Sequence, residues 1–316
     1  MSAENNKPRI VFMGTPEFAV ASLEALVKAG YPIVGVITAA DKPAGRGMQL
    51  TESAVKKYAL QAGLKILQPE KLKNPEFLDT LRGLNADLQI VVAFRMLPES
   101  VWNMPPMGTV NLHGSLLPQY RGAAPINWAV INGEERTGVT TFKLQHAIDT
   151  GDILLQESFP IGEKETAGEV HDRMKEIGAC LLVRTVEGLA AGTLKEVPQE
   201  NAGLTTNAAL RSAPKIFTET CRIDWNRPAT EVYNLIRGLS PFPGAFTHLD
   251  GKLLKIYRAE KETGIPAVPA GHYSTDKKTW LKFACPDGAI SLKEIQLEGK
   301  KKMGIEDFLR GYKMSG

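Results

Sequence analysis

A strand-helix-strand pattern near the N-terminus constrains the fold more than any other feature of the sequence. Two short apolar runs, Arg9–Met13 and Ile33–Thr38, lie on either side of a helical segment. Thr15 is a suitable N-cap for that helix, Pro16 suits its first position, and Gly30 is a suitable stop. Two strands joined through a helix usually pair in parallel with a right-handed crossover. The pattern therefore predicts a β-α-β unit in a parallel sheet.

Further apolar runs extend the predicted sheet. The run Leu88–Phe94 is hydrophobic except at Gln89, which is typical of a strand buried on both faces. The other elements expected here are strands over Thr109–Leu112, Gly138–Leu144 and Ile153–Glu157 and helices over Pro125–Ile131 and Gly168–Leu189. Cys180, in the longer helix, is expected to be a small buried hydrophobe.

The pattern changes after Gly192. Residues Thr193–Pro214 are small and polar with no clear period, which predicts a linker on the surface. The elements expected beyond it are a helix over Pro228–Leu239 and strands over Ala245–Leu249, Lys252–Arg258, Thr279–Ala284 and Ala289–Gln296. Asp250-Gly251 and Asp287-Gly288 are hairpin turn signals, and this spacing suits a small antiparallel barrel.

These patterns predict an α/β protein with two domains. We expect a Rossmann-like, mostly parallel sheet domain over residues 1–192, a linker over 193–214, and a smaller OB-like β-barrel domain over 215–316. The charge is uneven, because residues 205–316 hold 18 Lys and Arg against 12 Asp and Glu, whereas residues 1–204 hold 20 against 23. A basic C-terminal third indicates a polyanionic partner. The alternative is a solvated face that includes Lys300–Lys302.

Several cofactors and locations fit the sequence poorly. Gly14 is followed by Pro16 and Glu17, where a dinucleotide loop needs glycines, so no NAD is expected. The three cysteines lie far apart without metal or redox spacing, which favours no metal site and a cytoplasmic protein. The longest uncharged stretch, Ser100–Tyr120, contains three prolines and is not expected to enter a membrane. Met1–Lys7 is short and polar, unlike a secretory signal.

The chemically most informative residues lie at predicted strand ends. Asn111 and His113 are two apart at the end of a strand, so their side chains are expected to face one point beyond the sheet. The turn Asp149–Asp152 falls between two other predicted strands. An amide donor, an imidazole and a carboxylate at one sheet edge suit acyl-type transfer, because they can stabilise an oxyanion and handle a proton. For Asn111 and His113 alone, a capped turn and a surface histidine would be the simpler interpretation.

These residues also carry a family resemblance. Asn111-x-His113-x-Ser115-Leu-Leu-Pro118, followed by Asp149-x-Gly151-Asp152, resembles the signature of 10-formyltetrahydrofolate-dependent formyltransferases. The segments Asp41–Gly47 (DKPAGRG) and His113–Ile126 (HGSLLPQYRGAAPI) are similar to those of the methionyl-tRNA formyltransferases in that family. The resemblance covers essentially the whole chain, including its basic C-terminal third.

The resemblance implies a reaction and a set of site residues. A formyl group would pass from 10-formyltetrahydrofolate to the α-amine of methionine on initiator tRNA. Asn111 would bind the formyl oxygen, His113 would assist the tetrahedral intermediate, and Asp149 would pair with His113 and help to remove the amine's proton. The folate site would be lined by Ser115, Leu116, Leu117, Pro118, Phe94 and Leu97. A monomer is expected.

The loop Ala39–Leu50 is expected to join a strand to a helix that begins near Thr51. It is polar, contains two glycines beside Arg46, and is expected to stay mobile until a ligand binds. A guanidinium between glycines suits contact with tRNA phosphates or base edges, so Arg46 is a candidate tRNA-binding residue. The alternative is a surface connector with a solvated Arg46.

Other functions fit parts of the sequence. Glycinamide ribonucleotide formyltransferases resemble only the N-terminal part, and their motif usually has Pro where Gly114 stands. Amino-sugar formyltransferases can share the stretch Asn111–Pro118, but the loop that contains Arg46 disfavours them. A formyltetrahydrofolate hydrolase module would be expected to precede a dehydrogenase region, and none follows Gly316. A non-catalytic RNA-binding protein would not require Asn111, His113 and Asp149 together.

Overall fold

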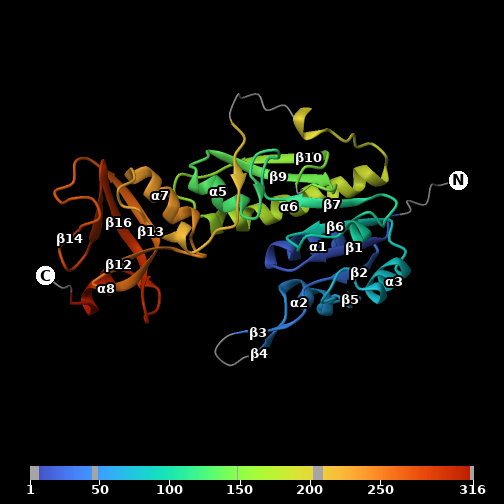
Figure 1. Ribbon diagram of the computed structural model, residues 1–316, viewed down its shortest axis with the longest axis horizontal. Coiled ribbons are helices and arrows are strands. Elements are labelled where there is room, and N and C mark those ends of the chain that lie inside the picture. The colour runs from blue at the N-terminus through green and yellow to red at the C-terminus, as the bar shows by residue number, and fades with distance from the viewer. Residues whose placement is uncertain (1–6, 45–48, 148, 202–208, 314–316) are drawn as a thin grey trace. The chain divides into compact units, whose positions relative to one another are not determined.

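The computed structural model describes residues 7–44, 49–147, 149–201 and 209–313 (Figure 1). The chain forms two compact units, and their limits interleave along the sequence. The first unit comprises Met1–Arg121, Gly138–Ser158 and Asp172–Arg211, and the second comprises Gly122–Thr137, Phe159–His171 and Ser212–Gly316. No helix within the described ranges is long and apolar enough to cross a membrane.

A seven-stranded sheet forms the centre of the first unit, in the order β10-β9-β7-β6-β1-β2-β5 (Figure 1). Its strands are β1 (Ile10–Gly14), β2 (Ile33–Ile37), β5 (Ile66–Leu67), β6 (Leu88–Val92), β7 (Thr109–His113), β9 (Arg136–Lys143) and β10 (Ile153–Pro160). The strands from β7 to β5 in this order are parallel to their neighbours, whereas β9 is antiparallel to β7. The predicted β-α-β unit and mostly parallel sheet are therefore confirmed.

Helix α1 (Glu17–Lys28) follows β1 through a tight turn. Its N-cap is Pro16, and no side chain caps this helix, so the prediction of Thr15 as N-cap is wrong. The reason is that the carbonyl of Pro16 accepts the first helical hydrogen bond, from the Ala19 amide at 3.0 Å. A Cβ on Gly14 would lie 2.6 Å from Ala19 Cβ. Gly14 therefore allows the helix to pack closely on the sheet.

Further helices and strands complete the first unit. They are the helices α2 (Ala54–Gln61), α3 (Pro75–Gly83) and α4 (Glu99–Trp102), the strands β3 (Lys42–Ala44) and β4 (Gln49–Thr51), and most of α6 (Ala167–Ala190). β3 and β4 pair antiparallel, so part of the expected loop Ala39–Leu50 is a hairpin. The next helix begins at Ala54 rather than near Thr51, because Ser53 caps it through the Lys56 amide at 3.0 Å.

The prediction that Cys180 is buried is wrong, because this cysteine is exposed. Helix α6 buries Met174 and Leu181 on one side. Asp172 and Glu176 are exposed, and Cys180 continues their stripe at a spacing of four residues. Cysteine is small enough for either face, so its hydrophobicity does not decide its position.

The second unit contains an antiparallel sheet in the order β12-β13-β16-β15-β14, with β17 paired to β16. Its elements are α5 (Pro125–Ile131), α7 (Ala229–Gly238), β12 (Ala245–Leu249), β13 (Lys252–Thr263), β14 (Tyr273–Thr275), β15 (Leu281–Cys285), β16 (Gly288–Leu297), β17 (Met303–Gly304) and α8 (Ile305–Gly311). The remaining elements of the chain are short. They are the two-residue strands β8 (Arg121–Gly122) and β11 (Ser212–Ala213) and the 3-10 turns at Gln199–Asn201 and Glu219–Cys221. The predicted α/β fold with a C-terminal antiparallel sheet is confirmed.

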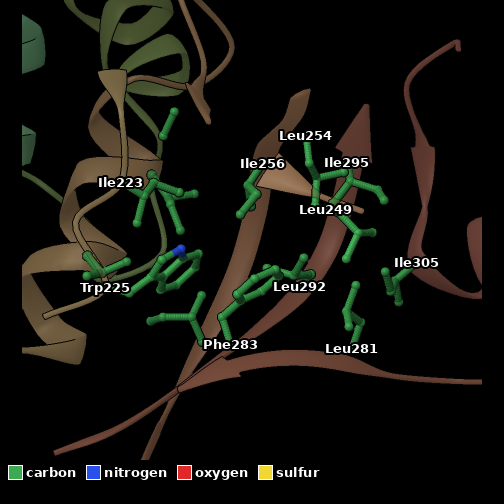
Figure 2. Packing of buried hydrophobic residues seen from close by; sticks show 14 of the residues in the cluster. Ile223, Trp225, Leu249, Leu254, Ile256, Leu281, Phe283, Leu292, Ile295 and Ile305 are labelled. Carbon is green, nitrogen blue, oxygen red and sulfur yellow. The ribbon is translucent and has the colours of Figure 1, made fainter. Parts of the chain in front are cut away.

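The curled sheet encloses its own apolar core, as Figure 2 shows. Trp225 and Phe283 stack with their ring centroids 4.6 Å apart, and the Trp225 indole N–H donates to Thr247 Oγ1 at 2.9 Å. Asp250 and Gly251 have φ values of +50° and +77°, as a tight two-residue hairpin requires. This arrangement confirms the predicted turn between β12 and β13.

Candidate active site

Strand β7 carries Asn111 and His113 at its carboxyl end. Asn111 lies opposite Val91 of β6 and Phe142 of β9, and His113 lies opposite Thr140. Asn111 is half-buried, whereas His113 is 6% exposed. Because alternate residues of a strand face the same side, both side chains leave the same face of the sheet.

The His113 imidazole has a defined orientation. Its Nε2 lies 2.9 Å from the carbonyl oxygen of Tyr120. A carbonyl can only accept, so Nε2 carries the hydrogen and donates it. The other ring nitrogen, Nδ1, lies 3.9 Å from Oδ2 of Asp149. Nδ1 is therefore the atom that can gain or lose a proton, and it faces a carboxylate.

Asp149 belongs to the connection between β9 and β10. Its side chain is 12% exposed, and its backbone adopts a left-handed φ of +53°. The connection closes tightly, because the Lys143 amide donates to the Asp152 carbonyl at 3.1 Å. A Cβ on Gly151 would lie 1.6 Å from the Lys143 carbonyl oxygen, so only glycine fits there. This closure holds the Asp149 carboxylate near the end of β7.

The turn that follows His113 is held in place by hydrogen bonds to its backbone groups. Thr140 Oγ1 donates to the Ser115 carbonyl at 2.6 Å and accepts from the Leu117 amide at 3.1 Å. Gln156 Nε2 donates to the Leu117 carbonyl at 2.9 Å. Ser115 Oγ donates to the Gln119 carbonyl at 2.6 Å. These bonds fix the path of the predicted folate-site segment Ser115–Pro118.

The side chains of this segment are mostly buried. Ser115, Leu117 and Pro118 are buried, and Leu116 is half-buried. Leu117 packs with Phe142 of β9 and the first residue of β10. Any ligand beside this turn would therefore meet its backbone and Leu116 more than the other three side chains.

Phe94 and Leu97 follow β6, the strand next to β7. Phe94 is half-buried, Leu97 is buried, and both belong to the apolar cluster that includes Val91 and Val101. Leu97 and Arg95 also line an open hollow of about 660 Å³ in the first unit. These residues lie at the sheet edge that carries Asn111 and His113, because β6 and β7 are parallel.

Arg46 lies outside the described residues. Within the described ranges, no three His, Cys, Asp or Glu side chains gather as metal ligands would.

The comparisons with known proteins agree along the whole chain. A family model described as formyl transferase matches residues 8–186, and one described as formyl transferase, C-terminal domain, matches residues 215–313. The chain belongs to the formyl transferase family. The resemblance inferred from its sequence motifs is confirmed.

Two similar relatives are both named methionyl-tRNA formyltransferase. The protein of Parabacteroides distasonis is 57% identical over 311 residues, which cover 96% of each chain. That of Bacteroides fragilis is 52% identical over 312 residues, covering 97% of this chain and 96% of the relative.

Solved structures share the fold at low identity. One is a sugar 3N-formyl transferase, WlaRD, with a TM-score of 0.67 at 19% identity, covering 94% of this chain and all of that one. Another is HypX from Aquifex aeolicus in complex with tetrahydrofolic acid, with a TM-score of 0.64 at 19% identity. The match covers 98% of this formyl transferase and 49% of HypX.

The structure of this formyl transferase adds site residues that were not singled out from the sequence. Thr140 and Gln156 hold the turn after His113, and Gln199 reaches the loop that carries Asp149. The adjacent threonines Thr140 and Thr141 lie inside a predicted strand, and this pair was a usable signal for Thr140. Gln199 lies in the segment predicted as a linker on the surface. No feature of that sequence indicated that its side chain is buried.

Proposed function

We propose that this protein transfers a formyl group from 10-formyltetrahydrofolate to the α-amine of methionine on initiator tRNA. The observation that carries the proposal is identity above 50%, over nearly the whole chain, to proteins named methionyl-tRNA formyltransferase. The arrangement of Asn111, His113 and Asp149 at one sheet edge supports it, because it supplies the groups that acyl transfer needs. We expect a monomer that acts in the cytoplasm.

The chemistry is an addition followed by an elimination. The amine nitrogen attacks the formyl carbon, and the carbonyl electron pair moves to oxygen. The side-chain amide of Asn111 and the Nδ1–H of protonated His113 donate to that oxyanion. When the carbonyl re-forms, the bond from carbon to N10 of the folate breaks. The amine loses one proton and N10 gains one, so the formamide and tetrahydrofolate leave with atoms and charge balanced.

His113 and Asp149 handle these protons. Because Nε2 is committed to the Tyr120 carbonyl, Nδ1 is the ring nitrogen of His113 that can exchange a proton with the reacting groups. The carboxylate of Asp149, 3.9 Å from Nδ1, accepts the amine's proton. The folate is proposed to lie along Ser115–Pro118, with Phe94 and Leu97 beside its pterin.

The second half of the chain is proposed to bind tRNA. We assign catalysis to residues 1–192, a linker to 193–214, and tRNA binding to 215–316. The supporting observation is the net excess of basic residues after residue 204. Lys300 and Lys301 are exposed in the turn between β16 and β17, where they are available to phosphates. Arg46 is proposed to contact the same tRNA.

A competition between acceptors tests the proposal. The purified protein is given 10-formyltetrahydrofolate with charged initiator tRNA, glycinamide ribonucleotide or an amino-sugar nucleotide. We expect formylation of the tRNA-linked methionine at a rate at least about 100-fold above that of either small amine, a difference of about 2.7 kcal/mol in transition-state free energy. Preferred formylation of a small amine would contradict the proposed function.

A further inference from the structure

The side chain of Gln199 joins Arg121 to the loop that carries Asp149 through four hydrogen bonds. Its Oε1 accepts from Arg121 at two guanidinium nitrogens, with distances of 3.0 Å to Nε and 2.6 Å to Nη2. Its Nε2 donates to the carbonyl oxygens of Asp149 at 2.8 Å and Gly151 at 2.9 Å. Gln199 is 5% exposed. All the hydrogen-bonding capacity of a primary amide is thus used inside the protein.

Arg121 determines which way this amide points. A guanidinium only donates, so the oxygen of the amide must face Arg121 and the nitrogen must face the loop. The two loop carbonyls only accept, which requires the same orientation. Exchanging the oxygen and nitrogen of Gln199 would place donor against donor and acceptor against acceptor. The amide is therefore a fixed two-pronged clamp on the loop.

The clamp acts where the loop conformation is least favourable. Asp149 has a left-handed φ of +53°, which costs free energy for a residue other than glycine. Gln199 binds the carbonyls on either side of Thr150, so it opposes relaxation of this turn. The backbone of Val197 also pairs with Ile153 in both directions, at 2.8 and 2.9 Å. This pairing holds Gln199 beside the exit of the loop.

We propose that Gln199 is a positioning residue for formyl transfer, which keeps the Asp149 carboxylate beside Nδ1 of His113. The inference rests on the proposed function and deepens it. Gln199 does not touch the reacting atoms, and it acts through the backbone of Asp149. Displacement of a catalytic group by about 1 Å can cost about 100-fold in rate. Loss of the clamp should therefore lower kcat while leaving the folate site in place.

The first test is Gln199→Met, which keeps the length of the side chain and removes its hydrogen bonds. We expect kcat to fall about 10- to 100-fold, with KM for the folate changed by less than about threefold. Near-wild-type kcat in a folded Gln199→Met protein would overturn the inference.

A double-mutant cycle separates positioning from general support of the fold. If Gln199 acts through Asp149, adding Gln199→Met to Asp149→Asn should lower kcat by less than about twofold further. Losses that multiply would show that Gln199 does not act through Asp149. If Gln199→Met fails to fold, Gln199→Glu replaces it, because glutamate can still accept from Arg121 but cannot donate to the two carbonyls. The same loss of kcat is expected for Gln199→Glu.

A control variant lies on the same segment. Glu196 pairs with Lys143 at 2.6 Å but makes no contact with the loop carbonyls that Gln199 binds. We expect Glu196→Gln to retain kcat within about twofold, because exposed ion pairs contribute little. Formylation of charged initiator tRNA by the wild type tests the proposed function by itself. If the wild type formylates it and the Gln199 variants match the wild type, only the positioning role fails.

Discussion

At the scale of single residues, the orientation of His113 shows how one imidazole would serve the proposed reaction. Its Nε2 donates to the Tyr120 carbonyl, which leaves Nδ1 beside Asp149. Ring rotation would break the hydrogen bond of a nearly buried group, which is unfavourable. Asn111 leaves the same face of β7 two residues earlier, so a donor and a proton carrier occur together.

This arrangement predicts the effect of removing either group. Asn111→Ala and His113→Ala should each lower kcat about 100- to 1,000-fold, because loss of one preorganised oxyanion donor costs that much. Single-turnover formylation of charged initiator tRNA measures the loss, and near-ultraviolet circular dichroism checks the fold. A folded His113→Ala protein with ordinary turnover would remove His113 from the mechanism.

The cysteines give a second prediction at this scale. Burial raises the pKa of the Cys285 thiol to about 11, and Asp287 adds to the shift, whereas Cys180 is exposed. At pH 8 only about 0.1% of Cys285 would be thiolate, three pH units below that pKa. An alkylating reagent should therefore modify Cys180 first and Cys285 only after denaturation, as peptide mass spectrometry would show. Rapid labelling of Cys285 in the native protein would contradict this ordering.

Sequence reasoning reached some residues of the candidate site and missed others for a physical reason. Asn111 and His113 share a strand, so their common face follows from a period of two residues. The partners of Gln199 lie 48 to 78 residues away along the chain. No local period reports such contacts, and they form only when the whole sheet has assembled.

At the scale of elements, long apolar runs were predicted well and short elements poorly. β1 and β6 are buried at every residue, and their sequences are apolar except at Gln89 of β6. By contrast, β5 and β17 have two residues each, and their sequences carry no period of their own. Such strands form because a neighbouring strand supplies hydrogen-bond partners. The local sequence contains no sign of that neighbour.

The β3–β4 hairpin is held at its base. The Asp41 carboxylate forms an ion pair with Lys56 of α2 and accepts from Gln68 Nε2 at 2.8 Å. The hydrogen bonds from Lys56 and Gln68 hold the pKa of Asp41 below its usual range. The start of the hairpin is therefore attached to the first unit. Arg46 follows this attachment point closely in the sequence.

We expect Arg46→Ala to lower formylation of charged initiator tRNA at least about tenfold, which is close to 1.4 kcal/mol of transition-state stabilisation. Folate binding should hardly change, since the proposed folate residues lie on other elements. The matched control is Lys57→Ala, which removes one exposed cation from α2. Equal losses in tRNA formylation and folate binding would instead show that Arg46 supports the folate site.

At the scale of the whole molecule, neither compact unit is one continuous stretch of the sequence. Residues 122–137 and 159–171 belong to the second unit although they precede the segment 172–211 of the first. Within the second unit, Asn127 Nδ2 donates to the Gly238 carbonyl at 2.7 Å, and Arg237 Nη1 donates to the Glu165 carbonyl at 3.2 Å. A truncation near Thr205 would remove Gly238 and Arg237, the partners of Asn127 on α5 and of Glu165, so charge substitutions test tRNA binding more cleanly.

Lys300 and Lys301 are suited to that test, because both are exposed in the turn between β16 and β17. Some other basic residues of the sheet already pair with carboxylates, as Lys282 does with Glu262 at 2.7 Å. If both lysines contact phosphates, replacing them with serine should reduce the slope of log K against log salt by about two, roughly one for each released counterion. Lys28→Ser is the control, because Lys28 lies on α1 and pairs with Glu24 at 2.7 Å. Filter binding of initiator tRNA from low to moderate salt would measure the slopes. An unchanged slope in the double variant would show that this turn is a solvated face, and the tRNA would then have to meet other basic residues.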